Sequence, residues 1–218
     1  GTVDVVVQTS DNGDTTLANA YAYNPAGEIA GIAPATGSWT GGYEGVISGT
    51  NLCNGSNVTN VTLCGASAAI VSQSGTQVVV TAGAALAAGL GDVVVQSTSY
   101  GTTVKSNAFT YNAPGLQVLG TNGATVVSGD EAQAANGTKF PPLLSHTSWT
   151  NTFSITNNGT ETLNISGFGH VNPDFEITDL PDSVAAGTAS NFTVRFAPTG
   201  VGTYNDWLTI SNDSPTAA

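Results

Sequence analysis

Residues 89–115, GLGDVVVQSTSYGTTVKSNAFTYNAPG, decide how this chain is organised. They form two alternating apolar stretches around a central turn, a pattern typical of a β-hairpin. Residues 1–27, GTVDVVVQTSDNGDTTLANAYAYNPAG, repeat them without a gap at an offset of 88 residues, with 13 of 27 positions identical. An internal repeat of this period suits a small β-sandwich. We therefore expect residues 1–27 to be the last hairpin of a preceding copy, with the chain beginning in the middle of a repeat.

The composition favours an all-β protein. Of 218 residues, 40% are hydrophobic and only 8% are charged, which is not a disordered composition. Short alternating stretches are separated by glycine-rich turns at the spacing of a sandwich. The only helix-like stretch, residues 82–90 (AGAALAAGL), contains glycines that limit it to one turn at most. We expect tandem immunoglobulin-like β-sandwiches over residues 28–115 and 116–218, preceded by the hairpin 1–27.

The charge balance excludes two classes of partner. Three basic residues, Lys105, Lys139 and Arg195, stand against fifteen acidic ones, which gives a net charge of -12. Binding to nucleic acid or to an anionic membrane needs clustered lysine and arginine, so neither partner is expected. No apolar run approaches the ~20 residues of a membrane-spanning helix, and we expect no membrane insertion in this chain.

Two cysteines, Cys53 and Cys64, flank a polar loop. We expect a disulfide between them, which by loop-closure entropy would stabilise the fold by about 3 kcal/mol and would indicate an oxidising compartment. The alternative is a pair of small buried thiols. A zinc site is not favoured, because neither histidine lies near them in the sequence.

Acceptor triplets for N-glycosylation support an extracellular location. We expect covalent glycans at eight asparagines, namely Asn54, Asn57, Asn60, Asn136, Asn158, Asn164, Asn191 and Asn212. Three of the eight lie in residues 54–62, inside the proposed disulfide loop, so that loop would have to be exposed.

Residues 28–115 resemble the TIG (or IPT) domain, an immunoglobulin-like fold. The residues that carry the resemblance are, in order, Gly31-Ile32-Ala33-Pro34, Gly41-Gly42, Gly49-Thr50-Asn51-Leu52, Val61-Thr62-Leu63-Cys64-Gly65 and Phe109-Thr110-Tyr111. The resemblance implies a role in extracellular arrays, receptors, adhesive surface proteins or certain DNA-binding factors. The charge balance argues against the last of these.

The second half resembles the ASH-type (abnormal-spindle and hydin-like) immunoglobulin fold and its "choice-of-anchor" relatives on microbial surfaces. The residues that carry this resemblance are FSITNNGTETLNI at 153–165, Asp174-Phe175-Glu176-Ile177, Phe196-Ala197-Pro198, Tyr204 and Ile210-Ser211-Asn212-Asp213. Such domains continue into one more strand, so we expect this sandwich to lack its last strand.

A surplus hairpin and a missing strand suggest self-assembly. An extended segment of one copy can complete the sheet of another, and a head-to-tail contact of this kind propagates as a filament. We expect the chain to be a non-catalytic extracellular fibre subunit that binds copies of itself, with Val3, Val5 and Val7 in the donor strand. The alternative is a fragment of a cell-surface adhesin or receptor array, with carbohydrate binding as a further role.

The sequence carries no enzymatic motif. Neither histidine lies in an H-E-x-x-H pattern and there is no G-x-S-x-G nucleophile elbow. The acids Asp174, Glu176, Asp179 and Asp182 could form paired carboxylates or a weak calcium site, but exposed acids at strand ends are far commoner. We expect no enzyme, no cofactor and no metal. For sugar binding, Trp39 is the aromatic residue that we expect to be most exposed.

Overall fold

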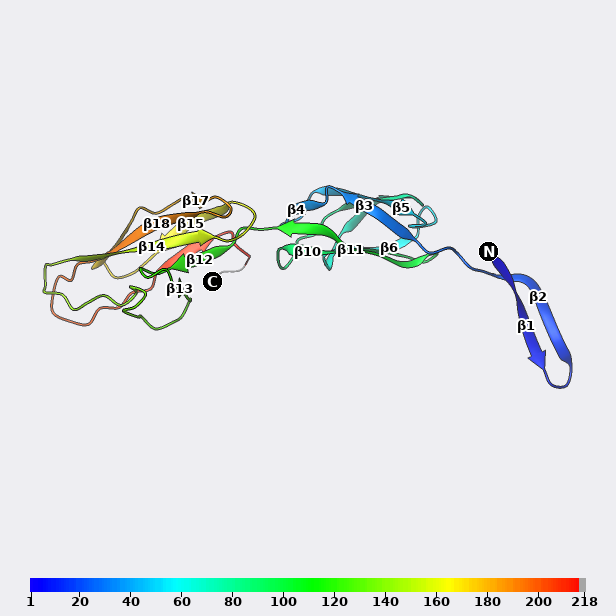
Figure 1. Cartoon of the computed structure of the whole chain (residues 1–218), viewed down its shortest axis with the longest axis horizontal. Helices are drawn as coiled ribbons and strands as arrows, with labels where there is room; N and C mark the ends of the chain where they lie inside the picture. Colours follow the sequence, from blue (N-terminus) through cyan, green and yellow to red (C-terminus); the bar gives the residue numbers. More distant parts are fainter. Residues whose placement is uncertain (216–218) are drawn as a thin grey trace. The chain divides into compact units, whose positions relative to one another are not determined.

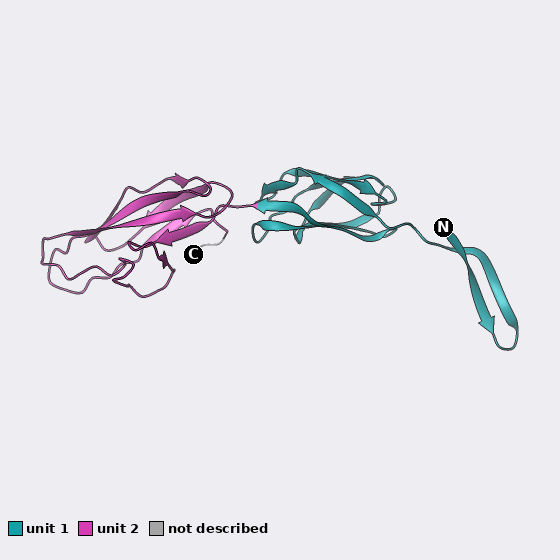
Figure 2. Cartoon of the chain, viewed as in Figure 1, with its two compact units in different colours: residues 1–111 teal, residues 112–218 magenta. Residues whose placement is uncertain are grey.

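The computed structural model describes residues 1–215 and divides the chain into two compact units, Gly1–Tyr111 and Asn112–Ala218 (Figure 2). Every regular element in residues 1–215 is a β-strand, which confirms the all-β fold class. Residues 82–90 contain no helical turn, and Gly89 already begins a strand.

The N-terminal hairpin pairs β1 (Thr2–Thr9) with β2 (Gly13–Ala22) (Figure 1). Gly13 closes the turn with a φ of 72°, a left-handed conformation that glycine adopts without steric cost. A register shift between Val3 and Val5 marks a β-bulge. Every residue of both strands is exposed.

The first sandwich follows the hairpin. One sheet has the order β4-β11-β10-β6-β7 and the other has the order β3-β5-β9-β8. The strands are β3 (Glu28–Ala33), β4 (Thr36–Ser38), β5 (Glu44–Thr50), β6 (Val58–Leu63), β7 (Ala66–Ser67), β8 (Ala69–Gln73), β9 (Gln77–Thr81), β10 (Gly89–Ser97) and β11 (Gly101–Asn112).

Alternation along the strands builds the core between these two sheets. In β9, Val78 and Val80 are fully buried while Gln77 is exposed, as a period of two requires. They pack in one cluster with residues of the facing sheet such as Val93 and Phe109. Burial of this apolar surface drives the two sheets together.

The corner after β5 shows why the G-x-N-L motif occurs there. A Cβ at Gly49 would collide with the carbonyl oxygen of Glu28 on the paired strand β3, so only glycine fits. Asn51 adopts a φ of 51°, which asparagine tolerates better than most residues, and its side chain donates to the carbonyl of Ala26 at 3.2 Å. Leu52 then enters the core, where it is fully buried.

The predicted disulfide is contradicted, because Cys53 and Cys64 are free. The Cys53 thiol donates to the carbonyl of Ser74 at 3.1 Å, and the Cys64 thiol donates to the carbonyl of Phe109 at 3.2 Å. Cys64 directly follows β6, whereas Cys53 lies five residues before that strand, and the two thiols contact different segments, the β8–β9 turn and β11. Burial raises the pKa of the Cys64 thiol, which keeps it protonated.

The second sandwich lies in the other unit. Its larger sheet has the order β13-β12-β14-β18-β16 and its smaller sheet has the order β17-β15-β19. The strands are β12 (Leu116–Leu119), β13 (Thr125–Val126), β14 (Trp149–Asn157), β15 (Leu163–Gly169), β16 (Phe175–Thr178), β17 (Ser183–Val184), β18 (Ala189–Phe196) and β19 (Thr209–Asn212). In residues 1–215, β15 is the one strand paired with β19.

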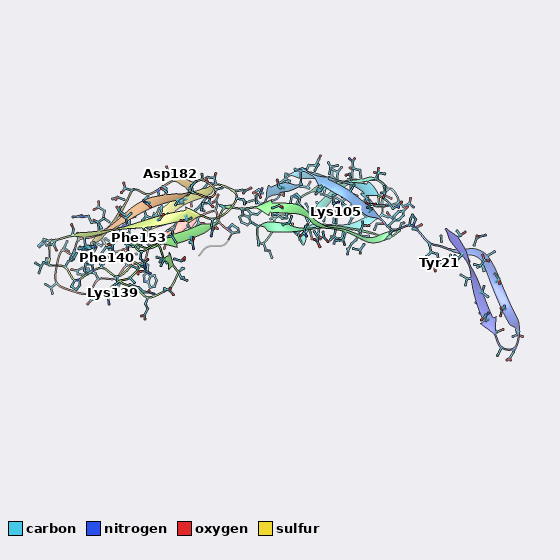
Figure 3. All side chains as sticks on the ribbon, viewed as in Figure 1. Tyr21, Lys105, Lys139, Phe140, Phe153 and Asp182 are labelled. Atoms are coloured by element: carbon cyan, nitrogen blue, oxygen red, sulfur yellow. The ribbon has the colours of Figure 1, made fainter. Side chains whose placement is uncertain are left out.

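Phe153, Ile155, Leu163 and Phe192 form the centre of this second core. Phe153, which Figure 3 labels, stacks on Phe192 with ring centroids 5.5 Å apart, because the two residues are direct cross-strand partners on β14 and β18. Residues 153–165, which carry the resemblance to the ASH-type fold, thus run from one strand through a turn into the next. The second core leaves a long irregular segment, residues 127–148, between β13 and β14.

Candidate functional site

A concave surface of the second unit lies where this irregular segment meets the start of β14. We call it the Trp149 groove, and its volume is about 440 Å³. Its lining is mainly apolar and comprises Thr121, Ala134, Gly137, Lys139, Phe140, Pro141, Pro142, Trp149 and Asn151. A groove of this size falls in the range of small-molecule binding sites.

Hydrogen bonds fix the orientation of Trp149. It begins β14, and Asn151 follows two residues later on the same face of the strand. The indole Nε1–H of Trp149 donates to Asn151 Oδ1 at 2.8 Å, and Asn151 Nδ2 donates to the carbonyl of Gly137 at 2.7 Å. The indole is 49% exposed, so its ring is held in place while remaining open to solvent.

The irregular segment is braced around Asn136, which is buried. Asn136 Oδ1 accepts from the Thr138 backbone N–H at 3.1 Å and from the Thr138 hydroxyl at 2.8 Å, and its carbonyl accepts from Thr121 N–H at 2.9 Å. The backbone N–H of Lys139 donates to the carbonyl of Gln133 at 3.0 Å. These bonds give a segment without regular structure a defined backbone.

Aromatic packing anchors the groove from below. The ring of Phe140 lies 5.7 Å from that of Phe175 and 5.8 Å from that of Phe196, both in edge-on geometry. Phe175 and Phe196 stack on each other at 4.7 Å. Figure 3 shows Phe140 and Lys139 as neighbours on the irregular segment, with Lys139 in the more exposed position.

This arrangement provides a preformed platform for a ligand with apolar faces and polar edges. The half-exposed indole and the two prolines offer flat apolar surface, and the exposed Lys139 ammonium can donate hydrogen bonds at the rim. Because Asn151 and Gly137 already hold the indole, binding need not order it, which lowers the entropic cost of association.

The sequence-based choice of an exposed tryptophan was wrong. Trp39 is partly buried and packs against the first core, because the turn that carries it folds back and its carbonyl accepts from Ala85 N–H at 2.8 Å. Trp207 is instead 70% exposed. The exposure of a side chain in a turn depends on which distant segments pack against it, so the position of Trp39 in a turn could not predict its exposure.

The predicted acidic cluster is divided among other interactions. Glu176 pairs with Arg195 at 3.1 Å, and Asp179 accepts from the hydroxyl of Thr178 at 3.1 Å. Asp182 is exposed (Figure 3). Across residues 1–215, no group of three or more His, Cys, Asp or Glu side chains is arranged to hold a metal ion.

The predicted glycosylation sites differ in their exposure. Asn54, Asn158, Asn164 and Asn191 are exposed, and Asn57, Asn60 and Asn212 are partly buried. Asn136 is buried and supports the groove wall, so a glycan there would require local unfolding. The predicted donor residues Val3, Val5 and Val7 lie in β1, paired along one edge with β2.

Residues 28–111 match the IPT/TIG domain family. This match confirms the resemblance of the first sandwich, which we call the IPT/TIG domain from here on. Among curated proteins, none matches the chain. In the part of the chain that the structure describes, no helix is long and apolar enough to cross a membrane.

Matches among solved structures include two surface glycan-binding proteins. One, from Prevotella bryantii, is 9% identical with a TM-score of 0.36, and the match covers 88% of this chain and 40% of that chain. The other, from Bacteroides ovatus in complex with a mixed-linkage heptasaccharide, is 13% identical with a TM-score of 0.30. That match covers 97% of this chain and 59% of that chain. An auxiliary nutrient binding protein from Bacteroides thetaiotaomicron is 19% identical with a TM-score of 0.34, and the match covers 45% of this chain and 23% of that chain. This chain thus spans less than two thirds of the length of each.

Proposed function

We propose that this chain is a non-catalytic, carbohydrate-binding part of a cell-surface array of immunoglobulin-like domains, with the Trp149 groove as its binding site. The observation that carries the proposal is the fixed, half-exposed indole of Trp149 above a braced aromatic and proline lining. The second sandwich, in this proposal, is the ASH-type domain that its sequence resembles. The IPT/TIG domain acts as a neighbouring structural module.

The chemistry of a sugar suits this groove. A pyranose ring presents C–H groups on its faces and hydroxyls around its edge, so it stacks on an aromatic face and hydrogen-bonds at the rim. A net charge of -12 opposes binding of acidic polysaccharides. Neutral glycans are therefore the expected ligand class, with Lys139 as a hydrogen-bond donor to hydroxyl oxygens.

Glycan-array binding by the full chain tests this proposal, followed by isothermal titration with the neutral oligosaccharide that gives the strongest signal. Trp149→Ala should weaken binding about five- to thirtyfold, because loss of ring stacking and apolar contact costs about 1–2 kcal/mol. The fold should survive, since about half of the indole surface is already exposed.

Trp207→Ala is the matched control. Trp207 is an exposed tryptophan of the same unit and does not line the groove, so its removal should leave affinity unchanged. Equal losses for the two variants, or no binding to any neutral glycan on the array, would refute the proposal.

The head-to-tail fibre is a second candidate function. It is favoured by the exposure of Val3, Val5 and Val7, an apolar surface that a soluble monomer rarely leaves open. Because β1 is already paired with β2, the donated element would be the whole hairpin. The unpaired edge of β1 would form the hydrogen bonds to the sheet of the accepting copy. Electron microscopy of the purified chain at neutral pH would test it, with filaments as the supporting result.

A further inference from the structure

The N-terminal hairpin exposes a face that has the composition of a core. Val5, Val7, Tyr21 and Tyr23 are 42%, 56%, 54% and 61% exposed. The rings of Tyr21 and Tyr23 lie 4.9 Å apart in edge-on geometry on β2 and the residue that follows it, and Figure 3 labels Tyr21 there. Large exposed apolar faces mark surfaces that another element covers.

The repeat identifies the buried counterpart of this face. At an offset of 88 residues, the four positions correspond to Val93, Val95, Phe109 and Tyr111 of the hairpin β10–β11. These side chains are no more than 1% exposed, and they belong to the core of the IPT/TIG domain. One sequence pattern is thus exposed in the first hairpin and buried in the second.

The two hairpins also share their backbone conformation. Each cross-strand pair of β1 and β2 has its equivalent 88 residues later, and the bulge between Val3 and Val5 recurs between Gly91 and Val93. Asn19 has a φ of 53° and its N–H donates to Asp4 Oδ1 at 2.7 Å. Asn107, the equivalent of Asn19, has a φ of 52°, and its N–H donates to Asp92 Oδ1 at 3.0 Å. The first hairpin is therefore already shaped for the place that β10–β11 occupies.

Three features of the IPT/TIG domain cover the β10–β11 face. Strand β6 pairs with the outer edge of β10, from Val93↔Leu63 to Ser97↔Val58. The sheet β3-β5-β9-β8 packs isoleucine and valine side chains onto the face. The carbonyl of Gly83 accepts from the hydroxyl of Tyr111 at 2.8 Å. All three features come from the residues between 28 and 88.

We propose that the Val5/Val7/Tyr21/Tyr23 face docks into a second IPT/TIG-type sandwich, whose other strands are a segment of the same polypeptide on the N-terminal side of the hairpin. That segment would supply an edge strand for β1, a sheet of isoleucine and valine, and a carbonyl acceptor for the Tyr23 hydroxyl. The IPT/TIG domain of a second copy is not the occupant, because it already holds its own β10–β11 in that place.

The chain itself provides a probe for this proposal. Residues 28–88 are joined in front of Gly1 of the full chain, so that Gly1 follows Ala88 as Gly89 does in the native sequence. Amide hydrogen exchange is then compared with that of the unextended chain. Amides of β1 and β2 should slow at least about a hundredfold, because they become part of a cooperative sandwich.

Substitutions on the two faces of β1 provide the control. In the extended chain, joint substitution V5D and V7D should abolish the protection, since both side chains would enter a core. Val6→Asp should preserve it, because the equivalent Val94 lies on the opposite, partly exposed face. A second extended chain, in which residues 89–115 replace 1–27, shows whether such an added sandwich folds.

Two results would overturn the proposal. One is that the added residues 28–88 leave the exchange of β1 and β2 unchanged, although the second extended chain, with residues 89–115 in place of 1–27, gains full protection. The other is protection of the hairpin in the unextended chain that grows with protein concentration and disappears in the V5D and V7D variant. That second result would identify a second copy as the occupant.

Discussion

At the scale of single residues, Asp206 shows how one carboxylate organises a loop. Its Oδ1 accepts from Trp207 N–H at 2.8 Å and Val171 N–H at 3.1 Å, and its Oδ2 accepts from Asn172 N–H at 3.0 Å. His170 Nδ1 lies 3.3 Å from Oδ2. Burial raises the pKa of Asp206, but the backbone donors and His170 outweigh burial, so the pKa falls below its ordinary value of 3.8.

A lowered pKa gives this carboxylate a stabilising effect with a defined pH range. The effect is complete above pH of about 4, and it is lost as the pH falls through the lower folded-state pKa. Asp206→Asn should therefore lower the Tm by about 5 °C at pH 7, and the difference from the native chain should shrink towards pH 2. Thermal unfolding followed by circular dichroism measures both. Asp182→Asn, at an exposed position, is the control, and a pH-independent difference for Asp206→Asn would contradict the assignment.

At the scale of elements, Asn157 joins three strands of the second sandwich. It is fully buried at the end of β14, and its Nδ2 donates to the carbonyls of Glu161 at 2.7 Å and Val184 at 2.9 Å. Its Oδ1 accepts from the N–H groups of Gly115 and Gly159, both at 3.0 Å. The amide thus ties β17, the approach to β12 and the β14–β15 turn to one point.

Asn157→Ala should destabilise the second sandwich by about 3 kcal/mol, because it leaves buried backbone groups without partners. Asn157→Asp should cost at least as much, since it keeps the shape but removes both N–H donors and buries a charge. Urea unfolding of the full chain measures both effects. Ser154→Ala, a partly buried position of the same strand, should stay within about 0.5 kcal/mol of the native chain. An alanine variant at 157 as stable as the native chain would refute this role.

Strands with alternating apolar residues could be predicted, whereas elements fixed by distant partners could not. Strand β9 is a short run of β-branched residues bounded by polar ones, with Val78 and Val80 buried and Val79 only partly buried, a pattern that is readable in the sequence. Strands β7 and β17 have two residues each, too few for any period to appear. The Trp149 groove lies beside a segment without periodicity. Its residues Phe140-Pro141-Pro142 match no sequence pattern that predicts a binding site. They form the groove only together with residues of other elements, such as Phe175 and Asn151.

At the scale of the whole molecule, the charge is poorly balanced. Fifteen acidic residues face three basic ones, and the ion pair between Arg195 and Glu176 is exposed on both sides. Mutual repulsion of like charges destabilises a compact state, and dissolved salt screens it over a Debye length of about 10 Å at 0.1 M. Salt should therefore stabilise this protein, whereas a fold that depended on surface ion pairs would lose stability.

Raising NaCl from 10 to 300 mM at pH 7 should increase the Tm by a few degrees, equivalent to about 1 kcal/mol. Calorimetry of the full chain measures the shift, and KCl at the same ionic strength should give the same shift if screening is its cause. Lowering the pH from 7 towards the isoelectric point of about 4.1 removes negative charge, so the salt effect should diminish there. A Tm that falls with salt at pH 7 would mean that attraction between charges, and not repulsion, dominates the electrostatic free energy of folding.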